Sequence, residues 1–101
     1  MPTPYTAPYT VLNEGNTSRF LLICDHACNA IPEDYAQLGL HEHELERHVA
    51  WDMGAAEVTR HLADILGCPA ILSGFSRLLI DPNRGLDDPT LIMKLSDGSI
   101  I

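Results

Sequence analysis

A helical segment between two short apolar segments is the feature that most constrains how this chain can fold. Residues 19–24, RFLLIC, have the length and apolar density of a fully buried strand. A second strand is expected at 69–72, after a helical pattern for which Gly67 is a natural stop. Because a helix between two strands favours a parallel or mixed sheet, the sequence predicts an α/β fold. The expected architecture is a mixed, largely parallel sheet flanked by helices.

Residues 41–67 have helical character and are expected to form two pieces. The first is expected over 42–50, and Gly54 then weakens the continuity of the helix. Asp52 is suited to cap a second helix that begins at Met53. The apolar residues of this second helix follow the pattern of one stripe, with charged residues on the other face; the stripe consists of Ala55, Val58, Leu62, Ile65 and Leu66.

A third apolar run, 78–80, lies within the sequence FSRLLIDPNR and is typical of a short buried strand. Pro82 has no amide hydrogen, so this strand should end near Asp81. Arginine binds a carboxylate through two parallel hydrogen bonds, so the flanking residues suit a small carboxylated molecule. They are Arg77 at one end of the strand and Asp81, Asn83 and Arg84 at the other. A surface Arg–Asp pair around an ordinary strand is the alternative.

The length of 101 residues predicts one domain, with residues 1–18 as an extended lead-in to the α/β part at 19–101 and residues 1–10 loosely held. Asp and Glu outnumber Lys and Arg by 14 to 6, which gives a net charge of −8. This charge disfavours nucleic acid and anionic membranes as partners, because phosphates would be repelled. The sequence has no apolar stretch near the roughly 20 residues of a membrane span, and its N-terminus does not resemble a secretory signal.

The three cysteines show no disulfide or zinc-ribbon spacing, so we expect reduced thiols in a cytoplasmic protein. Cys24 and Cys28 are possible soft metal ligands, although cysteine commonly fills buried space. Ser76 lacks the G-x-S-x-G context of a nucleophile.

His26 follows the first strand, at the position where open α/β sheets bind their ligands. Its imidazole could bind zinc through one nitrogen while a carboxylate or a backbone group holds the other. A hydrogen-bonded loop histidine is the alternative. His48 and Asp52 are four residues apart and would share one face of a continuous helix, either as ligands or as an exposed pair.

The acidic segment 41–46, HEHELE, lacks the HExxH motif of zinc proteases and is most simply a solvated helix face. A second interpretation makes it a partner-binding surface through Glu42, Glu44 and Glu46.

Three motifs in order, ICDHACNAIP, RHVAWDMGAA and SRLLIDPNR, resemble the N-formylglutamate amidohydrolase family. The resemblance begins near Phe20 and continues through DDPTLI to SDG. It implies metal-dependent amide hydrolysis of an N-acyl acidic amino acid, converting N-formyl-L-glutamate to L-glutamate and formate. The family is similar to zinc carboxypeptidases and aspartoacylases. The implied fold is therefore carboxypeptidase- or phosphorylase/hydrolase-like and incomplete, with 19–101 as the N-terminal part of one hydrolytic domain.

The resemblance also implies a role for each candidate residue. His26 and Asp52 would bind Zn²⁺, since Asn29 stands where a carboxypeptidase-like motif has glutamate. The remaining roles are an oxyanion-stabilising, catalytic Arg77, substrate-binding Asn83 and Arg84, and Asp81 to orient an arginine. A small carboxylated amide is the implied substrate, and the oligomeric state stays open.

Members of the family are longer, so the third zinc ligand and the general base are expected beyond residue 101. A catalytic zinc site takes three protein ligands and an open position. The alternative function is therefore a catalytically incomplete fragment or remnant that acts only as a binding or interaction domain.

Overall fold

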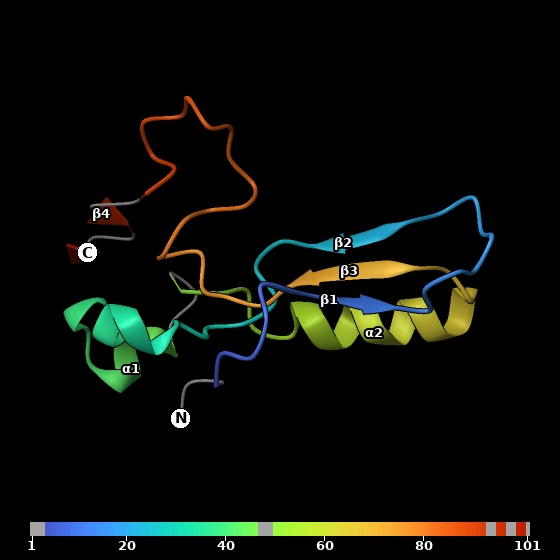
Figure 1. Cartoon of the computed structure of the whole chain (residues 1–101), viewed down its shortest axis with the longest axis horizontal. Helices are drawn as coiled ribbons and strands as arrows, with labels where there is room; N and C mark the ends of the chain where they lie inside the picture. The colour runs from blue at the N-terminus through green and yellow to red at the C-terminus, as the bar shows by residue number, and fades with distance from the viewer. Residues whose placement is uncertain (1–3, 47–49, 93–94, 97–98, 101) are drawn as a thin grey trace.

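A computed structural model shows a three-stranded sheet with one long helix packed against it (Figure 1). It describes residues 4–46, 50–92, 95–96 and 99–100. In chain order the elements are β1 (Tyr9–Leu12), β2 (Leu22–Cys24), the 3-10 helix η1 (Glu33–Gly39), α1 (Glu42–Leu45), α2 (Ala55–Leu66), β3 (Ala70–Ser73), β4 (Leu95–Ser96) and β5 (Ser99–Ile100). Strands β4 and β5 form a separate antiparallel pair.

The main sheet has the strand order β1-β3-β2, with β2 parallel and β1 antiparallel to β3. Helix α2 connects the two parallel strands and contacts both of them, as a β-α-β connection requires. The predicted mixed α/β fold is thus confirmed. The predicted largely parallel character is seen only in part, because this three-stranded sheet has one parallel and one antiparallel pairing.

Residues 1–10 were predicted to be loosely held, and this is wrong at the end of that segment, because Tyr9 and Thr10 belong to the strand Tyr9–Leu12. These residues form β1 and pair along the whole of β3, from Tyr9 opposite Ser73 to Leu12 opposite Ala70. One further bond follows the strand, from the amide of Gly74 to the carbonyl of Pro8 at 2.8 Å. The part of the lead-in over Tyr9–Leu12 therefore belongs to the sheet.

Close approach of β1 to the end of β3 requires a glycine at position 74. A Cβ atom added there would lie 1.8 Å from the carbonyl oxygen of Ala7, which is backbone and cannot rotate away. We expect Gly74→Ala to lower the free energy of unfolding by about 2 kcal/mol, the usual cost of overpacking, measured by urea denaturation. Gly85→Ala is the control, because its Cβ would meet only the side chain of Asp87 at 3.0 Å. Equal effects of the two changes would contradict this account.

Helix α2 begins two residues later than predicted, and Asp52 does not cap it. The N-cap is Gly54, whose φ of +84° is left-handed and which makes no side-chain cap bond. Gly67 ends the helix with φ of +62°, as predicted. The first predicted piece, 42–50, is helical over Glu42–Leu45, and its part at 47–49 lies outside the described residues.

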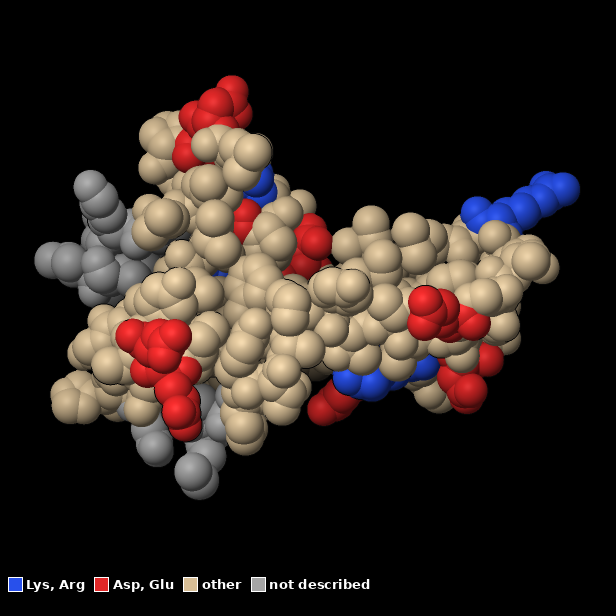
Figure 2. All heavy atoms as spheres, viewed as in Figure 1, with Lys and Arg blue, Asp and Glu red and all other residues tan. Residues whose placement is uncertain are grey.

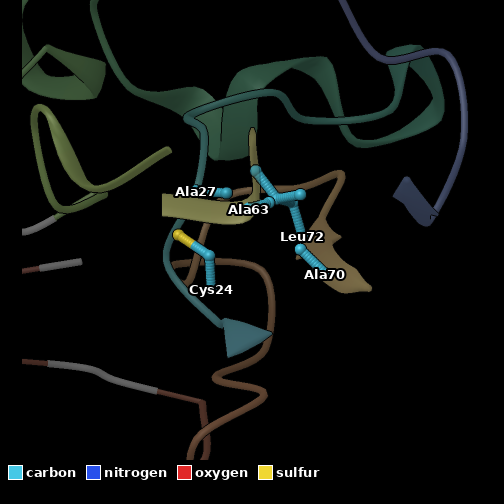
Figure 3. Close-up of a cluster of buried hydrophobic side chains, with 5 residues drawn as sticks. All are labelled: Cys24, Ala27, Ala63, Ala70 and Leu72. Atoms are coloured by element: carbon cyan, nitrogen blue, oxygen red, sulfur yellow. The ribbon is translucent and has the colours of Figure 1, made fainter. Parts of the chain in front are cut away.

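Small side chains fill the space between α2 and the sheet (Figure 3). The buried cluster consists of Cys24, Ala27, Ala63, Ala70 and Leu72. Ala63 is the buried residue of α2, and its small side chain lets the helix backbone approach the sheet. The longer aliphatic residues of the predicted stripe are exposed. Val58 and Ile65 are 59% and 64% exposed. The stripe is therefore largely exposed.

The run 19–24 is not the fully buried strand that the sequence predicted. Only Leu22–Cys24 is a strand, and Phe20 and Ile23 are both more than 60% exposed. The physical reason is that β2 is an edge strand with only Cys24 in the core cluster that includes Ala63 of α2, while Ile23 points to the opposite face of the strand. None of the helices in the described ranges has the length and apolar character to cross a bilayer.

Candidate functional site

The candidate site lies where β2 and β3 end and α2 begins (Figure 1). Parallel strands place their carboxyl ends at one edge of a sheet, which is the usual ligand position in α/β proteins. An open pocket at this edge is lined by Ile23, Cys24, Asp25, His26, Asp52, Met53, Gly54, Ala55, Val58, Thr59 and Asn83. Acidic and basic side chains adjoin in the hollow between the C-terminal loops and the sheet (Figure 2).

Residues 77–79 form a turn, and the strand predicted over 78–80 is not formed. The hydroxyl of Ser76 accepts a hydrogen bond from the amide of Leu78, and the Ser76 carbonyl accepts one from Leu79. Such local bonds compete with a sheet ladder. Leu78 is still buried, in a second cluster with Leu45 and Ala50. As a result, the polar groups expected at opposite ends of a strand lie beside one another.

Asp81 is the centre of this polar cluster and is only 1% exposed. Its Oδ1 accepts from His26 Nε2 at 2.7 Å and from the amide of Asn83 at 2.9 Å. Its Oδ2 accepts from Arg77 Nη2 and Arg84 Nε, each at 3.1 Å. Both carboxylate oxygens are thus fully used, and the position of Asp81 fixes two guanidinium groups and one imidazole.

Burial by itself would raise the pKa of Asp81, because a low dielectric disfavours the charged form. Hydrogen bonds from His26, the Asn83 amide and Arg84 outweigh burial and lower the pKa from 3.8 to about 2. Asp81 is therefore ionised at neutral pH, and as an acceptor-only group it requires a hydrogen on the Nε2 of His26.

The second ring nitrogen of His26 faces Asp52. Nδ1 lies 3.3 Å from Oδ2 of Asp52, and the imidazole is buried while the carboxylate is half exposed. With Nε2 protonated, a neutral ring presents a lone pair on Nδ1 towards a carboxylate oxygen. Two such atoms are held together by a shared cation, either a proton on Nδ1 or a metal ion.

The pair fits zinc in atom type and in spacing. Imidazole nitrogen and carboxylate oxygen are ordinary zinc ligands, with bonds of about 2.0–2.1 Å. Two such atoms on a tetrahedral ion lie about 3.3 Å apart, which is the separation of His26 Nδ1 and Asp52 Oδ2. In the described part of the chain, no group of three or more His, Cys, Asp or Glu could hold a metal. The pair would supply two of the three protein ligands of a catalytic site.

The two arginines and Asn83 adjoin this pair. Nη1 of Arg77 lies 3.9 Å from Oδ1 of Asp52, and its Nε is buried without a hydrogen-bond partner among the described atoms. Arg84 donates from Nη1 to the hydroxyl of Thr90, which holds its guanidinium from a second side. Asn83 lines the pocket. The structure therefore brings together all six residues that the sequence singled out for the site.

Other candidates from the sequence are used elsewhere. Asn29 is buried and donates from Nδ2 to the carbonyl of Leu45 at 2.7 Å. Cys24 lies in the core cluster. Burial raises the pKa of the Cys28 thiol and so favours its protonated form, whereas a metal binds the thiolate. The hydroxyl of Ser76 is buried and donates to the carbonyl of Ala50.

Two further predictions concern the helical region. His41 and His43 are exposed and stack on one another, with ring centroids 5.9 Å apart. The predicted pairing of His48 with Asp52 involves a residue outside the described ranges. The sequence analysis missed Ser73, whose hydroxyl makes hydrogen bonds to the backbone on both sides of His26. Its position directly after the strand predicted at 69–72 is the pattern that would have indicated it.

Comparisons with known proteins show the family of the chain and a solved structure with a similar fold. The family model of N-formylglutamate amidohydrolase matches residues 18–101. The chain belongs to the N-formylglutamate amidohydrolase family. A solved structure, the crystal structure of gene product Atu2144 from Agrobacterium tumefaciens, is 35% identical over 93% of this chain, with a TM-score of 0.89. The chain spans 37% of the length of that protein. No curated protein matches it.

N-formylglutamate amidohydrolases are named for amide hydrolysis.

Proposed function

We propose that this chain carries metal- and substrate-binding residues of a zinc-dependent amidohydrolase that converts N-formyl-L-glutamate to L-glutamate and formate. The observation that carries the proposal is the 3.3 Å approach of His26 Nδ1 to Asp52 Oδ2, with two arginines anchored on Asp81 beside it. Family membership supports the reaction class. A reduced cytoplasmic environment would suit the three free cysteines.

In this proposal His26 and Asp52 hold the zinc ion. A bound zinc ion would supply a water of lowered pKa and polarise the formyl carbonyl. Asp81 keeps the imidazole of His26 in one tautomer, with the hydrogen on Nε2 and the lone pair on Nδ1. Partners of this kind orient the ligand and typically change metal affinity by about 10–100-fold.

Arg77 has the position of an oxyanion stabiliser. Its guanidinium is held by Asp81 and extends to within 3.9 Å of Asp52. A donor fixed beside the ligand pair would stabilise the negative charge that develops on the formyl oxygen. One such donor contributes about 3 kcal/mol to a typical acyl-transfer transition state.

Arg84 and Asn83 would bind the carboxylate end of the substrate. Arg84 is held through Nε and Nη1, which leaves Nη2 to meet a carboxylate, and its neighbour Asn83 lines the pocket. Holding the substrate here raises its effective concentration at the metal.

Formate release is the direct test of this proposal. The purified protein is loaded with Zn²⁺ and incubated with N-formyl-L-glutamate, and formate is measured with and without a chelator. Chelator-sensitive release is the expected result. A second function, binding without turnover, is favoured by the presence of only two potential ligands in the described part of the site. Zinc binding without formate release would support that function and contradict the first.

Arg84→Ala is expected to raise KM for N-formyl-L-glutamate by about tenfold or more and to change kcat little. The reason is that an interaction made equally in the bound substrate and in the transition state affects KM alone. The measurement is steady-state formate release. Arg60→Ala is the matched control, since Arg60 is an exposed arginine on α2 away from the pocket. A lower kcat at unchanged KM would show that Arg84 acts on the transition state instead.

A further inference from the structure

Ser73, the last residue of β3, is bonded to the backbone on both sides of His26. Its hydroxyl donates to the carbonyl of Asp25 at 2.6 Å and accepts from the amide of Ala27 at 3.2 Å. Backbone pairing of β2 with β3 ends one position earlier, where Cys24 lies opposite Leu72. The side chain of Ser73 therefore continues the connection between the strands after the ladder has stopped.

The position of these two hydrogen bonds matters because the chain turns at residues 25–26. His26 is buried in that turn, and its ring meets Asp81 with one nitrogen and Asp52 with the other. A hydroxyl both donates and accepts, so one serine can hold a carbonyl and an amide at the same time. The two peptide groups that Ser73 holds are those that determine where the Cα–Cβ bond of His26 points.

We propose that Ser73 is a positioning residue for His26. By holding the peptide groups that flank His26, it keeps Nδ1 directed at Asp52 while Nε2 bonds to Asp81. The consequence for zinc rests on the proposed function, whereas the orientation of the ring is a property of the protein without metal. Ser73 touches neither candidate ligand atom, so its effect on the site is transmitted through the backbone.

Ser73→Ala tests this role with two measurements. Competition with a chromophoric chelator is expected to show Zn²⁺ binding weakened about tenfold, the lower end for groups that support a ligand. Nuclear magnetic resonance of the metal-free protein is expected to show the His26 Nε2–H signal shifted or broadened. This hydrogen lies in the buried hydrogen bond between His26 Nε2 and Asp81 Oδ1, whose length is 2.7 Å. Ser73→Thr keeps the hydroxyl and should leave Zn²⁺ affinity within about twofold of the unmodified protein.

Asn13→Ala separates positioning from general loss of stability. Like Ser73→Ala it removes two side-chain bonds to backbone, from Asn13 Nδ2 to the carbonyls of Ala63 and Cys68, but at the far end of α2. It should lower stability and leave both site measurements unchanged. The proposal is overturned if Ser73→Ala leaves both at their original values, or if Asn13→Ala moves them equally. If the unmodified protein binds no Zn²⁺, the proposed function fails, and the Nε2–H signal still decides the role of Ser73.

Discussion

Asp81→Asn is expected to lower the free energy of unfolding by about 3 kcal/mol. The substitution keeps the shape of the side chain and removes the charge that pairs with Arg77, Arg84 and His26. Removing one partner from a buried ion pair costs about 3–5 kcal/mol, because the remaining charges stay desolvated. The lower end applies here, since both arginine side chains are partly exposed, at 18% and 31%. Urea denaturation measures the difference.

Asp87→Asn is the matched control, since it makes the same change at an exposed position in the next loop. Substitutions at exposed positions usually alter stability by less than about 0.5 kcal/mol. Equal losses from Asp81→Asn and Asp87→Asn would show that the Asp81 cluster does not stabilise the fold.

The same carboxylate predicts how stability depends on pH. The pKa of Asp81 is about 2 in the folded protein against an ordinary 3.8, so folding favours the ionised form. Its contribution is fully present above about pH 4 and is lost as the pH falls towards 2. The difference between the two pKa values, 3.8 and about 2, corresponds to about 2–3 kcal/mol. Asp81→Asn should remove this part of the acid dependence, which unfolding curves between pH 2 and 5 would measure.

His26→Ala is expected to weaken Zn²⁺ binding more than about 100-fold, because loss of a ligand should exceed the 10–100-fold cost of losing a supporting group. It removes Nδ1, one of the two atoms whose spacing fits the ion. Competition with a chromophoric chelator measures the affinity, as for the Ser73 variants.

His61→Ala is the control for that experiment. It makes the same change at an exposed histidine on α2 that does not line the candidate site. Asp52→Ala should reproduce the loss caused by His26→Ala. Unchanged Zn²⁺ affinity in both His26→Ala and Asp52→Ala would refute the assignment of the metal pair.

Local patterns in the sequence were sufficient for several elements of the fold. A helix that ends at Gly67 and a strand directly after it follow from short-range rules, and both are present. The same rules failed for 78–80, because three aliphatic residues in a row suit a buried turn as well as a buried strand. The hydrogen bond from the Ser76 hydroxyl to the carbonyl of Ala50 and the contact of Leu78 with Leu45 and Ala50 decided between them. These contacts join segments far apart in the chain.

The sequence by itself determined which chemical groups are available: an imidazole after the first strand, an acid before a helix, and two arginines around an aspartate. Only the tertiary structure decided that Asp81 joins them, since its shortest hydrogen bond reaches His26, 55 residues earlier in the chain. It also decided which nitrogen of His26 faces Asp52. The physical reason is that hydrogen-bond geometry and burial depend on distances in space, and residue spacing along the chain specifies such distances only within one helix, strand or turn.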